Sequence, residues 1–179
     1  AVKAAGAKVY AHENTRLWLQ GDFYVPWEDR HYTPQPEAMW PTDTFYESGE
    51  MSVGGRDVSY IHLKSAMTDG DVVVHLKDAD IIAAGDLVAV GAYPIFDWYT
   101  GGWLGAYTRA TEAMLELAGP GTKIVPGSGP VVGRDHLEKQ HDMLVTHHYA
   151  YVAANEFLPS AVNYVDARGH LFAGEGTRR

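Results

Sequence analysis

Two carboxylates, Asp69 and Asp71, stand on either side of Gly70. A pair of carboxyl groups held close together is an arrangement that general acid–base catalysis uses. Asp side chains in a glycine-containing turn also hydrogen-bond the backbone of that turn. We favour this second interpretation and expect both residues to shape a turn, with acid–base chemistry as the alternative.

Nine histidines are candidate metal ligands. Two histidines bind one metal ion from a helix when they are four residues apart, whereas the pairs on helix-like segments here are adjacent, five apart or seven apart. The two on strand-like segments have no carboxylate partner at a ligand spacing. We therefore expect structural roles for His62, His75, His136, His141, His147 and His148.

Ser128 lies between two glycines, which suggests a nucleophilic serine. A hydrolase elbow has the form Gly-x-Ser-x-Gly, but here the glycines are immediately adjacent to the serine and Pro126 and Pro130 flank them. The segment therefore does not predict a serine nucleophile. The chain also contains no cysteine, which excludes thiolate ligands, disulfides and a cysteine nucleophile.

The composition is that of one globular domain over residues 1–179. Hydrophobic residues make up 46% and charged residues 21%, and no apolar run approaches the roughly 20 residues of a membrane helix. The formal net charge of −9 disfavours nucleic acid and anionic membrane surfaces as partners. We expect a soluble protein that binds a small molecule, in a compartment, cytoplasmic or periplasmic, that the sequence leaves open.

Hydrophobic periodicity predicts strands in the middle of the chain, with helices before, between and after them. This order is typical of mixed α/β layers. The expected elements are a helix tail at 1–6 closed by Gly6, a strand at 8–11, a helix at 14–20, a long ordered loop at 21–41, a hairpin of 50–53 with 57–63, strands at 72–76 and 81–84, the latter buried on both faces, a helix at 103–118 capped by Thr100, a strand at 123–125, and a helix at 134–157 ended by Pro159.

Three segments, taken in order, resemble the metallo-β-lactamase superfamily, closest to its broad hydrolase branch. They are Ser65–Asp71 (SAMTDGD), Gly85–Leu87 (GDL) and Pro126–Pro130 (PGSGP). The similarity covers nearly the whole chain and implies an α/β fold, the αββα sandwich of that family. Further stretches similar to the same branch are Ala11–Arg16 (AHENTR), Tyr93–Asp97 (YPIFD) and the pair Gly101 and Gly102.

The resemblance implies a site for two metal ions, usually zinc, which activate water and polarise the bond under attack. It places three ligand positions in this chain. Met67 and Ser128 stand where the family has histidines, and Asp86 matches the bridging carboxylate. A thioether is a poor zinc ligand and a hydroxyl a weak one. Asp86 is the only matching ligand, so we expect no tight zinc binding.

The family's His-x-His-x-Asp-His cluster precedes the helix that we place at residues 1–6, and this chain contains no such motif. We therefore expect an N-terminally incomplete sandwich whose sheet lacks upstream strands. An apolar sheet edge left open in this way promotes association. Self-association, or a partner that completes the sheet, is the resulting expectation.

The resemblance implies descent from metal-dependent hydrolases of ester, thioester or lactam-type bonds, and the substituted ligands predict that catalysis is lost or impaired. A second hypothesis is an active hydrolase of such bonds with one functional metal, whose ligands come from a segment upstream of this chain and which Asp86 assists. A third is a non-catalytic binding or interaction domain. The residues that the family places at the mouth of its pocket are Tyr93, Phe96, Asp97, Trp98 and Trp103. The alternative for the four aromatic residues is that they cover the core where the loop that carries them meets helix 103–118.

Overall fold

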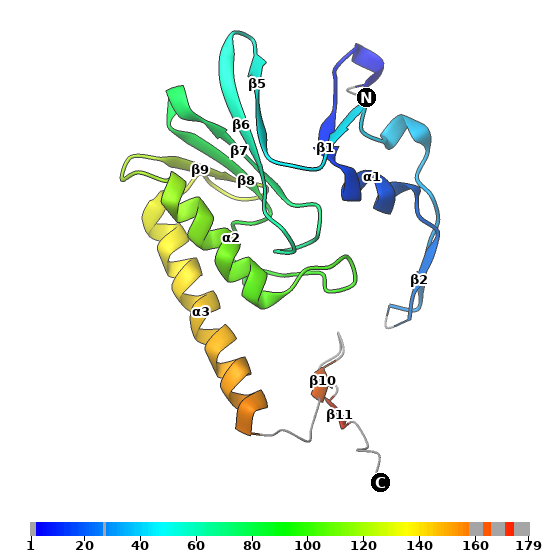
Figure 1. Ribbon diagram of the computed structural model, residues 1–179, viewed down its shortest axis with the longest axis vertical. Coiled ribbons are helices and arrows are strands. Elements are labelled where there is room, and N and C mark those ends of the chain that lie inside the picture. Colours follow the sequence, from blue (N-terminus) through cyan, green and yellow to red (C-terminus); the bar gives the residue numbers. More distant parts are fainter. Residues whose placement is uncertain (1–2, 27, 158–162, 166–170, 174–179) are drawn as a thin grey trace.

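A five-stranded sheet forms the centre of the molecule, in the spatial order β5-β6-β7-β8-β9 (Figure 1). The computed structural model describes residues 3–26, 28–157, 163–165 and 171–173. Neighbouring strands are antiparallel except for β8 and β9, which are parallel and are therefore joined by a long crossover that contains a helix. The strands are β5 (Gly49–Val53), β6 (Arg56–His62), β7 (Val72–Leu76), β8 (Ile81–Gly85) and β9 (Lys123–Pro126).

One face of this sheet packs against two helices, α2 (Leu104–Leu117) and α3 (Arg134–Phe157), which also pack against each other. Side chains alternate between the two faces of a strand, so Val73, Ile82 and Ile124 point to the helices and are fully buried. Their partners in this core include Tyr107 and Met114 of α2 and Leu137 of α3.

The opposite face is only partly covered. Over β6 it carries a smaller unit in which β1 (Tyr10–His12) pairs in parallel with β4 (Asp43–Phe45) and α1 (Glu13–Gln20) follows β1. The Phe45 ring packs on Tyr60 of β6, with ring centroids 4.4 Å apart. On β8, Ile81 and Ala83 are half-buried, so the prediction that this strand is buried on both faces is wrong. Self-association through an edge of the incomplete sheet stays a prediction.

The segment predicted as a long loop, 21–41, contains a short antiparallel hairpin of β2 (Phe23–Val25) and β3 (Arg30–Tyr32), with a 3-10 turn at Glu37–Met39. Aromatic rings stabilise this hairpin, since Phe23 stacks on Tyr32 at 5.3 Å and meets Trp18 edge-on at 5.2 Å. Strands of three residues are too short for their alternation to be recognised in the sequence.

Helix α2 begins at Leu104 with Trp103 in the N-cap position, so the predicted cap Thr100 is wrong. The physical reason is that the chain between these residues is held against the 65–67 loop, where the Trp103 amide donates to the carbonyl of Ser65 at 3.0 Å. Thr100 instead bonds the carboxylate of Asp97 at 3.0 Å.

The remaining predicted elements are confirmed within a residue or two. The N-terminal one is a 3-10 turn at Lys3–Ala5, closed by Gly6 at φ +81°, a backbone angle that favours glycine. The predicted stop at Pro159 lies outside the described residues. A further hairpin, β10 (Asn163–Val165) with β11 (Leu171–Ala173), was not predicted. None of the helices in the described part of the chain is long and apolar enough to cross a membrane.

Candidate functional site

A cavity of about 360 Å³ opens at the ends of strands β1 and β8. Three chain segments meet there: the start of the small unit, the loop between β6 and β7, and the loop after β8. The lining residues are Tyr10, Ala11, His12, Thr15, Met67, Thr68, Gly70, Asp71, Val72, Ala84, Gly85, Asp86 and Leu87. Two of the three predicted ligand positions, Met67 and Asp86, therefore face one cavity.

Asp86 lies directly after β8 and is exposed to solvent. Gly85 turns the chain with φ +56°, and its carbonyl accepts the Gly127 amide at 2.8 Å. The Asp86 carboxylate lies so close to Gly127 that a Cβ there would collide with its Oδ1 atom. No hydrogen bond or ion pair among the described residues engages this carboxylate. Asp86 is consequently open to a ligand from the cavity.

Two buried side chains hold the backbone behind Asp86. The Tyr107 hydroxyl donates to the carbonyls of Asp86 and Leu87, at 3.2 and 3.1 Å. Burial raises the pKa of this phenol, so it stays protonated as a donor at neutral pH. The Gln140 amide donates to the Leu87 carbonyl and accepts the Ala89 amide, at 2.8 and 2.9 Å. Helices α2 and α3 thus set the position of the Asp86 loop.

The loop that carries Met67 is organised by Asp71. Its carboxylate accepts the backbone amides of Met67 and Thr68, at 2.6 and 2.9 Å, and the Thr68 hydroxyl at 2.8 Å. Burial raises the pKa of Asp71, partly offset by these hydrogen bonds. The favoured interpretation, a carboxylate that bonds its own turn, is confirmed for Asp71.

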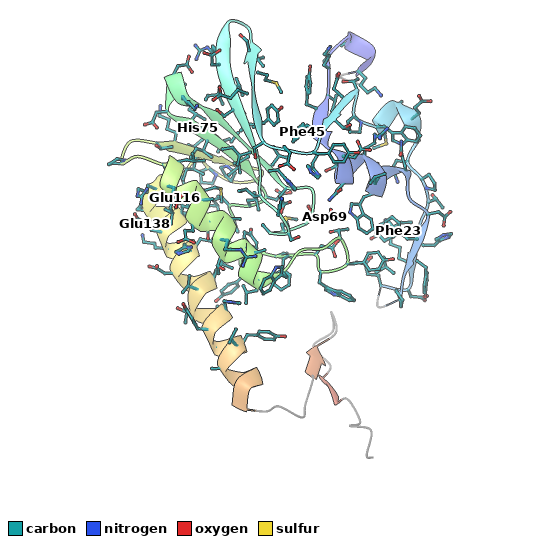
Figure 2. The ribbon with its side chains drawn as sticks, in the orientation of Figure 1. Phe23, Phe45, Asp69, His75, Glu116 and Glu138 are labelled. Atoms are coloured by element: carbon teal, nitrogen blue, oxygen red, sulfur yellow. The ribbon has the colours of Figure 1, made fainter. Side chains whose placement is uncertain are left out.

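Asp69 acts differently, because its carboxylate accepts the indole N–H of Trp18 at 2.9 Å and so joins the loop to α1. Its carbonyl also accepts a hydrogen bond from Asn14, at 3.2 Å. Figure 2 labels Asp69 together with Phe23, whose ring packs against the same Trp18. Asp69 therefore positions the loop against the small unit.

Ser128 does not line the cavity. It is exposed in the loop after β9, one residue beyond Gly127, which brings that loop against Asp86. The structure thus places all three family ligand positions around the end of β8, with Met67 and Asp86 in the cavity wall and Ser128 at its outside.

Sequence reasoning missed a histidine pair beside this cavity. His12 and His62 come from strands 50 residues apart and stack with ring centroids 3.7 Å apart. The His12 Nδ1 atom accepts the Asn14 amide as the N-cap of α1, and its Nε2 atom lies 3.1 Å from the Tyr46 carbonyl. His12 therefore uses both nitrogens within the fold. Its position just before a helical run was the one local signal.

His62 contributes to the same structural unit. Its Nε2 atom donates to the Asp69 carbonyl at 2.9 Å, and its buried Nδ1 atom has no hydrogen-bond partner among the described residues. Burial lowers the pKa of His62, with a further lowering by the neighbouring His12. His62 therefore favours its neutral form.

The helical histidines also make structural contacts. His136 Nε2 bonds the Ala89 carbonyl at 2.8 Å, and His141 Nδ1 bonds the Thr111 hydroxyl at 2.8 Å. The His148 ring meets Trp103 edge-on at 5.7 Å. These contacts agree with the expected structural roles.

The predicted mouth residues lie in the segment between Asp86 and α2, and none of them lines the Asp86 cavity. Tyr93 lines a second cavity beside α3. The Asp97 amide donates to the Met67 carbonyl at 2.7 Å, which ties this segment to the Met67 loop. Phe96, Trp98 and Trp103 are exposed by 38%, 55% and 44%. Their role as pocket residues stays a prediction.

The donors around this cavity do not fit zinc. Catalytic zinc needs three protein ligands drawn from histidine, cysteine and carboxylate side chains. Among the described residues no three such side chains form a group that could hold a metal ion. The family positions offer one carboxylate, one thioether and one hydroxyl, and only the carboxylate is a good zinc ligand.

The family model for the metallo-beta-lactamase superfamily matches residues 1–129. A search of curated proteins gave no match.

Among solved structures, a metallo-beta-lactamase from Pontibacter korlensis is similar with a TM-score of 0.60 and 21% identity, over 80% of this chain and 60% of that one. A metallo-beta-lactamase family protein from Thermus thermophilus has a TM-score of 0.59 and 16% identity, over 85% of this chain and 56% of that one. The structure of TTHA1623 in a di-iron-bound form has a TM-score of 0.56 and 21% identity, over 78% of this chain and 66% of that one. The chain thus spans about three fifths of the length of the first of these structures.

Proposed function

The chain belongs to the metallo-beta-lactamase superfamily, a lineage of metal-dependent hydrolases, and on that premise we propose that its own site has lost most or all metal-dependent hydrolysis. The reaction that we propose has been lost is the hydrolysis of ester, thioester or lactam-type bonds. One observation carries the proposal: of the family ligand positions in this chain only Asp86 is a good ligand, and among the described residues no three His, Cys, Asp or Glu side chains form a group that could hold a metal ion.

The ligand set explains the expected loss. A metal in such a site supplies the hydroxide nucleophile and polarises the bond under attack. Asp86 alone cannot hold such an ion against water. The Met67 thioether and the Ser128 hydroxyl are poor zinc ligands, so they do not complete the set of three that zinc needs. His12 does not replace them, because the fold already uses both of its ring nitrogens.

The open cavity supports a second candidate, a binding domain for a small molecule. The backbone around Asp86 is held by Tyr107 and Gln140, so the cavity keeps its shape without a metal. The exposed carboxylate of Asp86 would orient a ligand that carries a hydrogen-bond donor. This candidate predicts binding without turnover and without metal.

Zinc content tests the proposal. The purified chain is loaded with excess zinc, dialysed and analysed by elemental analysis. We expect far less than one tightly bound ion per chain, because only one good ligand is present. About two ions per chain would overturn the proposal.

A matched pair of variants tests whether the two substitutions cause this loss. Met67→His with Ser128→His restores the family ligands, and Met39→His with Ser52→His adds two histidines at exposed positions elsewhere. We expect more zinc on the first variant than on the second. Equal zinc on both would show that Met67 and Ser128 are not the cause.

Chromogenic ester, thioester and lactam probes, assayed with added zinc, test the activity itself. The original chain should hydrolyse them no faster than its Asp86→Asn variant. A rate that is zinc-dependent and disappears in Asp86→Asn would restore the active-hydrolase hypothesis.

A further inference from the structure

A second cavity, of about 450 Å³, lies between the segment after the Asp86 loop and the first half of α3. This volume falls within the range of roughly 300–1,000 Å³ typical of small-molecule sites. The segment contributes Ala92, Tyr93 and Pro94, and α3 contributes His136, Lys139 and Met143. None of these residues lines the Asp86 cavity, so the two cavities are separate.

Most of the wall is suited to an apolar ligand. Tyr93 is 80% exposed and presents its ring, while Pro94 and Met143 are half-buried. Methionine adapts its shape to irregular apolar ligands. The polar side chains between them are already engaged, because His136 bonds the Ala89 carbonyl and Gln140 bonds the 87–89 backbone. His136 Nε2 and both ends of the Gln140 amide therefore already have hydrogen-bond partners when an apolar chain covers them.

The one side chain with a full charge that lines the cavity is positive. Lys139 lines it and no Asp or Glu does, although the chain as a whole carries a net charge of −9. Lys139 makes one ion pair, with Asp135 at 3.7 Å, between side chains that are 79% and 77% exposed. Ion pairs this exposed contribute at most about 1 kcal/mol. The ammonium group can consequently turn to an anion bound in the cavity.

We propose that this cavity binds an amphipathic monocarboxylate of the medium-chain fatty acid class. The hydrocarbon chain lies along Tyr93, Pro94 and Met143, and the carboxylate pairs with Lys139. A carboxylate carries one negative charge, which matches the one lysine that lines the cavity. The proposal goes beyond the proposed function, since it needs neither Asp86 nor a metal.

Isothermal titration with decanoate, below its critical micelle concentration and with a chelator present, tests this proposal. We expect saturable binding. Lys139→Ala should weaken it by up to about fivefold, the equivalent of one exposed ion pair. Lys123→Ala, which removes an exposed lysine on β9, is the matched control and should leave the affinity unchanged.

Two variants that fill the cavity test the position of the hydrocarbon chain. Met143→Trp should weaken binding by at least about tenfold, because the ring occupies the space of the chain. Ala92→Phe does the same from the exposed segment, so that the test stands even where Met143→Trp fails to fold. Asp86→Asn should bind decanoate like the original chain, whatever the zinc content shows.

Absence of saturable binding overturns the proposal. Equal affinity in the original chain and in both Lys139→Ala and Ala92→Phe overturns it as well, since decanoate would then bind elsewhere. Loss of binding in Asp86→Asn with retention in Ala92→Phe would place the ligand in the first cavity and support the binding-domain candidate instead.

Discussion

The hydroxyl of Tyr107 is the atom whose removal tests how the Asp86 loop is held. Tyr107 is fully buried, and its hydroxyl donates to the carbonyls of Asp86 and Leu87. Tyr107→Phe removes only this oxygen and leaves the ring in the core. The Leu87 carbonyl keeps its bond from Gln140, so one carbonyl, that of Asp86, loses its buried donor.

The loss of one hydrogen bond to a buried carbonyl sets the expected decrease in the free energy of unfolding. Leaving one buried acceptor unsatisfied costs about 1–3 kcal/mol, and the remaining exposure of the Asp86 loop to water places this case at the lower end, about 1–2 kcal/mol. For a domain of this size each kcal/mol corresponds to roughly 2–4 °C in Tm. Tyr107→Phe should therefore lower Tm by roughly 2–8 °C.

The assay is urea unfolding followed by circular dichroism, with thermal unfolding beside it. Tyr149→Phe is the matched control, because it deletes the same atom from a tyrosine that is 69% exposed on α3. The control should change the free energy of unfolding by less than about 0.5 kcal/mol. Equal effects of the two variants would refute the argument that Tyr107 holds the Asp86 loop.

Three further predictions concern packing and pH. Gly102→Ala should cost more than about 2 kcal/mol, because its Cβ would lie 2.7 Å from the Met67 carbonyl carbon and 2.9 Å from the Asp97 carbonyl oxygen. Gly119→Ala, whose Cβ would meet only the Thr122 hydroxyl oxygen at 3.6 Å, should cost less in the same urea titration. Met114→Ala should cost about 2–5 kcal/mol, because Met114 is fully buried, and a cost below about 1 kcal/mol would contradict its place in the core. The lowered pKa of His62 means that the unfolded state binds a proton more readily, so stability is fully present above pH 6.5, the ordinary value, and falls as the pH drops below it. His62→Gln should flatten this decline between about pH 7.5 and 5.5, and an unchanged slope would count against it.

Local patterns in the sequence determined most of the regular elements. The alternation in β5, β6 and β7 and the three- and four-residue steps of α2 are set by the geometry of a single strand or helix. The order of the motifs around Met67, Asp86 and Ser128 also indicated the family, which the family model over residues 1–129 bears out. The residue types at these positions were enough to predict a poor zinc site.

The tertiary structure alone decided which distant residues meet. Three contacts join residues that lie far apart in the chain: the stacking of His12 on His62, the hydrogen bond from Trp18 to Asp69 and the hydrogen bond from Tyr107 to the Asp86 carbonyl. It also placed Tyr93 on a cavity beside α3. Helix and strand periods describe which way a side chain points from its own element, but the partner that it meets depends on how the elements pack. That packing is a property of the whole chain, which no local pattern contains.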